Sequence, residues 1–408
     1  MKYYIKTTGC PVNEVDSSLI KHTLEKLDYV ETSYFPEADI LILNGCYANN
    51  QNVKECFKEL NDMYDNRKSN SIIGVSGCFG HAEKNKIFNL FPDLNFCIGT
   101  FSYHKLEEII KNHLKQTEEI ISAGDKAQIY KDNNEITISS SNPNKMHLLI
   151  QEGCNNFCSY CIIPYIRGRE YSKPLENAIS EAKQCSVPIL DIAGQNIGRY
   201  QYGLSTLLKE LLKLNNFQCI SCINPLHPNE VNKELLDLFL FNDRIIQHLE
   251  ISAQSGSNRI LKLMNRKYDI ESFYKIYDYC KDYPMLTLGT DIIVGFPDET
   301  EEDFEKTLEL LKTTKMFNVN IYTYRKMEGT PASNMDNQIP EYVKNQRKEI
   351  CDKICEENYK EYIKYALGKI YKNCVVESYN NIEKAPIVAN IKLLEYIESE
   401  KCFIGEIV

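Results

Sequence analysis

The chain has 408 residues, of which 43% are hydrophobic and 25% are charged, as is ordinary for a globular protein of two or three domains. Its net charge of −10 argues against broad, non-specific binding of nucleic acid, which needs a basic surface. The opening stretch MKYYIKTTGC is too polar for a signal peptide, and no apolar run approaches the roughly 20 residues that span a bilayer. We therefore expect a cytoplasmic protein with no membrane partner.

Short apolar runs alternate with helical patterns through the first hundred residues. The runs that are typical of buried strands lie at 3–9, 39–44, 71–77 and 96–100. Helices are expected near 14–27, 51–65, 81–91 and 104–115. Such alternation predicts a parallel sheet covered by helices, and we assign residues 1–117 to an N-terminal α/β domain.

Three cysteines follow three successive strands of this predicted sheet: Cys10, Cys46 and Cys78. In parallel sheets, ligands bind outside the carboxyl ends of the strands, so we expect the three thiols to converge. Three buried thiols without a common role are the alternative. A site with these three ligands would leave one coordination position open.

Residues 118–144 are polar, and we take them as a linker that holds at most a short hairpin. A second alternating region follows at 145–335, and its six strand–helix units predict a partial TIM-type (β/α)6 barrel. The predicted strands lie at 146–153, 188–194, 217–223, 247–253, 287–296 and 319–324, and the predicted helices lie near 175–186, 204–214, 230–241, 257–265, 270–282 and 301–314.

The end of the chain predicts a charged helical connection at 336–366 and a small β appendage at 367–408. Basic residues along the chain could supply a local basic groove, or they could form ordinary solvated surface. These residues are Arg167, Arg169, Arg259, Arg266, Lys267 and the run KNQRKE at 344–349.

A Cys-x3-Cys-x2-Cys motif, formed by Cys154, Cys158 and Cys161, comes directly after the first predicted barrel strand. Structural zinc sites use four protein ligands, usually in two pairs, and no second pair lies close to this motif in the sequence. Cys219 and Cys222 are a Cys-x2-Cys pair, but they stand in the apolar run at 217–223, where we expect buried small hydrophobes. A disulfide would leave one thiol over and would form in the wrong compartment. An iron–sulfur cluster held by three thiolates fits better, with one iron open to another ligand.

This motif at the mouth of a partial barrel is similar to the signature of radical S-adenosylmethionine enzymes. Further stretches, in order, resemble the methylthiotransferase family within that superfamily: TTGCPVNEVDS, LNGCYANN, GVSGCFG, AGQNIGRY, HLEISAQSGSNRILKLMNRKY, TDIIVGFPDETEEDF and YRKMEGTPAS. The resemblance implies two 4Fe-4S clusters. Cys154, Cys158 and Cys161 would hold the radical-generating one, whose open iron binds S-adenosylmethionine. Cys10, Cys46 and Cys78 would hold an auxiliary one that carries the inserted sulfur.

Other residues are implied as contacts of S-adenosylmethionine or the substrate. Gly194, Gln195 and Asn196 end the second barrel strand, where the superfamily contacts the methionine part of the cofactor. Glu250, Ser252 and Gln254 are expected to alternate onto one face of the fourth strand, with a polar barrel layer as the alternative. The VGFP stretch that begins at Val294 is expected to shape the adenine pocket through its backbone.

The resemblance implies a transferase that places a methylthio group on carbon 2 of an N6-modified adenosine beside a tRNA anticodon, with the anticodon stem-loop as its partner. Some motifs favour the threonylcarbamoyl branch (IQEGCNNFC, MNRKY) and one favours the isopentenyl branch (GQN), and we prefer the former. A flavodoxin or ferredoxin as electron donor, a sulfur donor and a monomeric state are also expected.

Family members usually end in an RNA-binding β-barrel, the TRAM domain, and the segment here is short and not basic. Two alternatives therefore stay open. One is methylthiolation of a peptide or a ribosomal-protein residue. The other is a non-enzymatic iron–sulfur scaffold.

Overall fold

The structure is a computed structural model, and it describes residues 1–100, 102–111, 118–120, 144–222, 224–283, 285–376, 387–399 and 402–408. Two compact units divide the chain. The first consists of Met1–Asn155, Ile163–Glu181 and Ala193–Gln195, and the second of Asn156–Ile162, Ala182–Ile192 and Asn196–Val408. Residues 145–155, which we expected in the central domain, thus group with the first unit.

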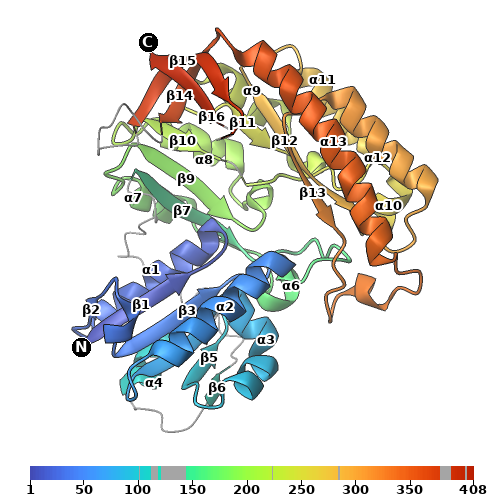
Figure 1. Cartoon of the computed structure of the whole chain (residues 1–408). Helices are drawn as coiled ribbons and strands as arrows, with labels where there is room; N and C mark the ends of the chain where they lie inside the picture. The colour runs from blue at the N-terminus through green and yellow to red at the C-terminus, as the bar shows by residue number, and fades with distance from the viewer. Residues whose placement is uncertain are drawn as a thin grey trace. The chain divides into compact units, whose positions relative to one another are not determined.

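The first unit contains a six-stranded sheet with the order β2-β1-β3-β4-β5-β6, and every described pair in it is parallel (Figure 1). Its strands are β1 (Lys2–Thr7), β2 (Val30–Glu31), β3 (Ile40–Gly45), β4 (Ile72–Ser76), β5 (Phe96–Ile98) and β6 (Glu118–Ile120). The predicted parallel α/β fold is confirmed. The two outer strands were not predicted: β2 has only two residues, and β6 takes up the start of the segment expected as linker. Most of that linker, 121–143, lies outside the described residues.

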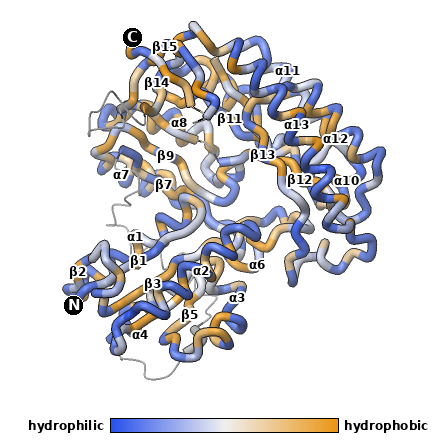
Figure 2. The backbone as a smooth tube through the Cα atoms, in the orientation of Figure 1, coloured by the Kyte–Doolittle hydropathy of each residue, from blue (hydrophilic) through white to orange (hydrophobic). Residues whose placement is uncertain are grey.

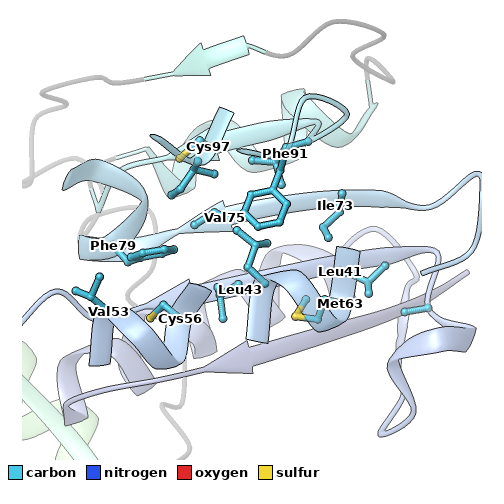
Figure 3. Close-up of a cluster of buried hydrophobic side chains, with 14 residues drawn as sticks. Leu41, Leu43, Val53, Cys56, Met63, Ile73, Val75, Phe79, Phe91 and Cys97 are labelled. Carbon is cyan, nitrogen blue, oxygen red and sulfur yellow. The ribbon is translucent and has the colours of Figure 1, made fainter. Parts of the chain in front are cut away.

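Helices cover both faces of this sheet: α1 (Pro11–Glu25), α2 (Asn50–Asn66), α3 (Gly77–Leu90) and α4 (Leu106–Lys111), with short 3-10 turns η1 (Phe35–Glu37) and η2 (Tyr103–Lys105). Alternate residues of β3 point to opposite faces. Leu41 and Leu43 pack in the cluster drawn in Figure 3, with side chains of α2 and α3. Ile40 and Ile42 pack in a second cluster with side chains of α1 and α4. Burial of each such side chain contributes roughly 1.5–3 kcal/mol, and β3 accordingly lies at the hydrophobic end of the scale in Figure 2.

Six strands follow one another with helices between them in the barrel region, as predicted. They are β7 (Lys145–Glu152), β9 (Ile189–Gly194), β10 (Cys219–Ser221), β11 (His248–Glu250), β12 (Thr287–Val294) and β13 (Asn318–Thr323), and the short β8 (Tyr171–Ser172) pairs antiparallel with β7. Parallel ladders join β10 to β9, β11 to β12 and β12 to β13. The helices are α6 (Ile163–Ile166), α7 (Leu175–Ala182), α8 (Leu204–Leu211), α9 (Lys233–Phe241), α10 (Asn258–Leu263), α11 (Ile270–Cys280) and α12 (Glu301–Thr314), with η3 (Ile197–Arg199), η4 (Pro228–Glu230) and η5 (Pro331–Asn334).

The second unit ends with the long helix α13 (Glu341–Ala366) and a three-stranded antiparallel sheet, as expected for a helical connection and a small β appendage (Figure 1). The strands are β14 (Ile370–Val376), β15 (Ile387–Ile397) and β16 (Cys402–Ile407). Aromatic rings join the helix to the sheet, because Tyr359 of α13 lies edge-on to Tyr396, which in turn packs on Phe403.

The KNQRKE run does not form an open basic groove, because two of its cations are buried within the second unit. Arg347 donates from Nη1 to Glu299 Oε2 at 2.6 Å, and Lys344 donates from Nζ to the Tyr324 carbonyl at 3.0 Å. Lys344 and Arg347 therefore form neither a basic groove nor solvated surface, the two alternatives left open for them. In the described part of the chain, no helix combines the length and the apolar character that crossing a bilayer demands.

Candidate active site

The three N-terminal cysteines lie at the carboxyl ends of three neighbouring parallel strands. Cys10 is the N-cap of α1, shortly after β1; Cys46 directly follows β3; and Cys78 is the second residue of α3, after β4. Because β3 pairs with both β1 and β4, these strand ends share one edge of the sheet. The thiols are close enough that Cys46 raises the pKa of both Cys10 and Cys78, after the larger effect of burial. The structure thus places the three cysteines at one edge of the sheet, and their convergence on one cluster stays a prediction.

The loops that carry these cysteines approach one another too closely for ordinary side chains. Gly9 has φ +115°, and a Cβ added there would lie 2.3 Å from Cys46 Cβ. Gly77 has φ +82°, and its added Cβ would lie 2.3 Å from Asn44 Oδ1. Glycine is required at both positions, since it alone tolerates this backbone conformation and this contact.

A buried arginine that the sequence did not single out for this place lies against the cysteines of the first unit. Arg167 donates from Nε to Cys78 Sγ at 3.1 Å, from Nη2 to Asp16 Oδ2 at 2.6 Å and from Nη1 to Glu152 Oε1 at 2.8 Å. Its side chain is 1% exposed. Arg167 therefore belongs neither to a basic groove nor to solvated surface, the two alternatives left open for it, because it is buried and paired inside the protein.

Burial controls the ionisation of the groups around Arg167. Desolvation raises the pKa of the Cys78 thiol to about 12, although the Arg167 cation acts in the opposite sense. Desolvation also raises the pKa of Asp16 to about 6, again against the pull of Arg167. The free thiol of Cys78 is thus held in the neutral form, and it becomes a thiolate ligand only when a positive metal centre compensates for burial.

The donor set fits an iron–sulfur cluster better than a single metal ion. Among the residues that the structure describes, no group of three or more His, Cys, Asp or Glu side chains is arranged around one ion. A cluster does not need such convergence, since each thiolate bonds a different iron. Three soft thiol ligands lie at one sheet edge, and Gly9 and Gly77 let the loops that carry them approach closely. Thiolates are the ligands that iron–sulfur clusters use, so this donor set fits a cluster.

The second cysteine motif lies in the loop after β7. The Cys154 N–H donates to the Gly168 carbonyl at 3.1 Å, and the Cys161 N–H donates to the Cys158 carbonyl at 2.9 Å, which closes a tight turn. Phe157 directly precedes this turn with φ +49°, a strained conformation for a side chain of its size. Cys158 is buried, and Cys154 and Cys161 are partly exposed. A strained, hydrogen-bonded loop of this kind holds its thiols in a fixed direction.

Within the second unit, a second buried arginine lies against this motif. Arg266 donates from Nη1 to Cys158 Sγ at 3.3 Å, from Nε to the Tyr268 hydroxyl at 2.8 Å and from Nη2 to the Ser252 carbonyl at 3.3 Å. Arg266 is buried, so it belongs neither to a basic groove nor to solvated surface, the two alternatives left open for it. Arg259 is half-exposed and forms an ion pair with Asp303 of α12.

The residues expected at the end of the second barrel strand are tied into hydrogen bonds. Gly194 ends β9, and Gln195 accepts the Gly153 N–H on Oε1 at 2.8 Å, which fixes the backbone just before Cys154. In the second unit, Asn196 donates from Nδ2 to Glu230 Oε1 at 3.0 Å.

The expected alternation of Glu250, Ser252 and Gln254 on one strand is wrong. The strand β11 ends at Glu250, and Gln254 has φ +65°, a left-handed conformation that breaks the two-residue repeat. Ser252 and Gln254 still lie near Arg266, because the Ser252 carbonyl accepts from Arg266, and Gln254 Oε1 accepts from Tyr160, whose hydroxyl is 3.3 Å from Arg266 Nη1.

Glu250 is buried and only partly paired. Its Oε1 accepts from His248 Nε2 at 2.8 Å and from Asn318 Nδ2, and its Oε2 has no hydrogen-bond partner among the described residues. An orphaned buried carboxylate oxygen is costly, and it indicates a place for a polar ligand. Val294, the last residue of β12, is fully buried and accepts the Tyr324 N–H through its carbonyl.

Comparisons with known proteins show the family of this chain. A model of the Radical SAM superfamily matches residues 148–311, and one of the uncharacterized protein family UPF0004 matches residues 2–99. A protein of Rickettsia akari named tRNA-2-methylthio-N(6)-dimethylallyladenosine synthase is 32% identical over 86% of this chain and 82% of its own. Proteins of the same name from Pelagibacter ubique and Clostridium novyi are each 33% identical, over 82% and 85% of this chain and 78% and 79% of their own. The chain belongs to the radical S-adenosylmethionine methylthiotransferase family.

Solved structures show the same fold at low sequence identity. The radical S-adenosylmethionine methyltransferase TsrM from Kitasatospora setae matches with a TM-score of 0.60 and 12% identity, over 81% of this chain and 76% of that one. The cobalamin-dependent enzyme OxsB matches with a TM-score of 0.56 and 14% identity, over 89% of this chain and 56% of that one. At such identities the likeness shows the fold alone.

As a member of the methylthiotransferase family, the protein is an enzyme that uses S-adenosylmethionine and two 4Fe-4S clusters. The alternative of a non-enzymatic iron–sulfur scaffold is therefore set aside. Two clusters need two sets of thiolates, and the described chain offers two sets of three, one at the sheet edge of the first unit and one in the loop after β7.

Proposed function

We propose that this methylthiotransferase acts on tRNA, where it places a methylthio group on carbon 2 of an N6-dimethylallyl-adenosine beside the anticodon. The observation that carries the proposal is the identity of 32–33%, over 82–86% of the chain, to relatives named for this reaction. The threonylcarbamoyl substrate that the sequence motifs favoured gains no support from these relatives, and the dimethylallyl substrate replaces it here.

Each set of three cysteines holds one of the two clusters, and the two clusters have different roles. Cys154, Cys158 and Cys161 hold the cluster that reduces S-adenosylmethionine, and Cys10, Cys46 and Cys78 hold the one that carries sulfur. When bound, the clusters supply an electron for cleavage of the cofactor and a sulfur atom for transfer. Gly194, Gln195, Asn196, Glu250, Ser252, Gln254 and Val294 are proposed to contact the cofactor or the substrate.

The chain's own part in the reaction is to hold, orient and shield. The Gln195 amide fixes the Gly153 N–H ahead of Cys154, and Arg266 places a buried positive charge beside the Cys158 sulfur. Glu250, with its orphaned oxygen, can accept one further hydrogen bond from a bound polar group. An electron donor such as flavodoxin or ferredoxin, a separate sulfur donor and a monomeric enzyme complete the proposal.

A peptide substrate is the second candidate, because the C-terminal sheet lacks the excess of positive charge expected of an RNA-binding domain. An RNA-binding appendage needs an excess of positive charge. Here Lys372 pairs with Asp243 at 2.7 Å, and Lys392 pairs with Glu406 at 3.3 Å. Those cations are neutralised within the protein, which favours methylthiolation of a peptide or ribosomal-protein residue if tRNA proves not to be the substrate.

Mass spectrometry of tRNA nucleosides tests the substrate directly. In cells without the gene, we expect the 2-methylthio form of dimethylallyl-adenosine to disappear and its precursor without the methylthio group to accumulate. A copy encoding the native chain or Cys185→Ala should restore the product, and Cys158→Ala should not, since Cys185 is a lone buried cysteine. If only the threonylcarbamoyl nucleoside changes, the substrate branch is wrong. If no methylthio-adenosine changes, the peptide candidate replaces tRNA.

Substitution of Gly9 tests the assignment of the sulfur-carrying cluster. Gly9→Ala adds a Cβ that would lie 2.3 Å from Cys46 Cβ, so Cys46 must shift, and we expect about four fewer irons per chain. Gly368→Ala is the matched control, because Gly368 has φ +79° but open space around its Cβ. Iron analysis after anaerobic reconstitution is the measurement, and full iron in Gly9→Ala would contradict the assignment.

A further inference from the structure

Arg167 occupies a place that ordinary ion pairing does not explain. It is among the largest fully buried side chains of the protein, and its three nitrogens reach three different groups: the thiol of Cys78 and the carboxylates of Asp16 and Glu152. Two carboxylates already balance one guanidinium. The Nε–H is nevertheless directed at a sulfur atom, which is a weak acceptor in a neutral thiol and a strong one in a thiolate.

The segment that carries Arg167 is the one that carries the other cysteine motif. Arg167 comes six positions after Cys161, and its N–H donates to the Ile163 carbonyl at 2.7 Å, which closes the short helix α6. The Thr100 hydroxyl in turn donates to the Ile166 carbonyl at 3.3 Å and ties α6 to the N-terminal part of the first unit. The chain thus passes from the radical motif to the sulfur-carrying site, where it contributes a cation.

A cation in this position changes the energy of the cluster's two redox states by different amounts. Reduction adds one negative charge to the cluster and its thiolates, and a hydrogen-bonded positive charge stabilises the more negative state more strongly. Low-dielectric surroundings increase the effect, and Arg167 and Cys78 are both buried. Glu152 acts in the opposite sense, because it is a negative charge 2.8 Å from the same guanidinium.

We propose that Arg167 is a positioning residue that raises the reduction potential of the cluster held by Cys10, Cys46 and Cys78, and that Glu152 lowers it. This inference rests on the proposed assignment of that cluster. It predicts changes of opposite sign for two neighbouring residues. Loss of the cation makes the cluster harder to reduce, and loss of the carboxylate makes it easier to reduce.

The test uses the full chain with Cys154→Ala, Cys158→Ala and Cys161→Ala, so that only the N-terminal cluster is bound. Its midpoint potential is measured by a redox titration followed by electron paramagnetic resonance at constant pH. We expect Arg167→Gln to shift the potential to more negative values, and Glu152→Gln to more positive ones. Arg167→Lys keeps the positive charge, so its midpoint potential should lie between that of Arg167→Gln and that of the triple-alanine parent chain.

Arg347→Gln is the matched control for the loss of a buried ion pair. Arg347 is also buried, and it also pairs with two carboxylates, Glu299 and Glu301, but it belongs to the second unit and contacts no cysteine in any described bond. The midpoint potential of the cluster in Arg347→Gln should equal that in the triple-alanine chain without this substitution. A general loosening of the protein would move Arg167→Gln and Glu152→Gln in the same direction, and that result would overturn the proposal.

Iron content separates the failure of this inference from the failure of the cluster assignment. If the parent binds about four irons and neither substitution shifts the potential, the role of Arg167 is wrong and the cluster assignment stands. If the parent binds no cluster, both are overturned. If Arg167→Gln does not fold, the positive shift of Glu152→Gln decides the question alone, and an unchanged potential in that variant counts against the proposal.

Discussion

Replacement of Cys154, Cys158 and Cys161 by alanine is expected to abolish cleavage of S-adenosylmethionine and to lower the bound iron from about eight to about four atoms per chain. The reason lies in the loop after β7, which offers three thiols and no fourth ligand in its sequence. The position left open is the one that the cofactor needs, so loss of the thiols removes both the electron source and the binding place of the cofactor. The measurements are 5′-deoxyadenosine released under reducing conditions and iron content.

Lone buried cysteines supply the controls for this prediction. Cys185→Ala and Cys280→Ala remove thiols of the second unit that are 3% and 2% exposed. Each should keep its iron and its cleavage activity, at a cost in stability of about 1–2 kcal/mol for the small cavity. Cofactor cleavage that persists in the triple variant would show that the radical site lies elsewhere.

The sequence predicted the fold well where apolar runs were long and bounded by turns. β3 is the clearest case, because its run of isoleucine and leucine can only be a strand buried on both faces. The outer strands β2 and β6 were missed. Val30 and Glu31 are exposed, and β6 consists of Glu118, Glu119 and Ile120, so neither carries an apolar pattern. Such strands form because a neighbouring strand offers unpaired backbone groups, which no local pattern reveals.

The sequence indicated the candidate cysteines by two signals, because Cys10, Cys46 and Cys78 each follow a strong strand signal and Cys154, Cys158 and Cys161 form a compact motif. The place of the arginines was not indicated. Arg167 and Arg266 were taken as candidates for a basic groove, since a sequence shows charge but not burial. A usable signal did exist for Arg167: it ends the apolar run IIPYI, and a cation inside such a run needs buried partners. Those partners, Asp16 and Glu152, are 151 and 15 residues away, and only the fold brings them together.

Removal of the other cysteine set is expected to separate the two chemical steps of the enzyme. The triple variant Cys10→Ala, Cys46→Ala and Cys78→Ala should still cleave S-adenosylmethionine, because the loop that holds Cys154, Cys158 and Cys161 is left intact. It should form no methylthio product, since the proposed holder of the transferred sulfur is lost. Product should fall below detection, while release of 5′-deoxyadenosine stays within about threefold of the native enzyme, a change of less than 0.7 kcal/mol.

The measurement is a single reaction in which 5′-deoxyadenosine and methylthiolated substrate are quantified together. Cys56→Ala is the matched control, because Cys56 is a buried cysteine beside the same site, with its sulfur 3.6 Å from the Cys46 carbonyl, but it follows no strand end. It should keep both products. Methylthio product from the triple variant would mean that the sulfur does not pass through this site. Loss of both products together with all iron would mean that the three thiols hold the first unit together, rather than supply one step of the reaction.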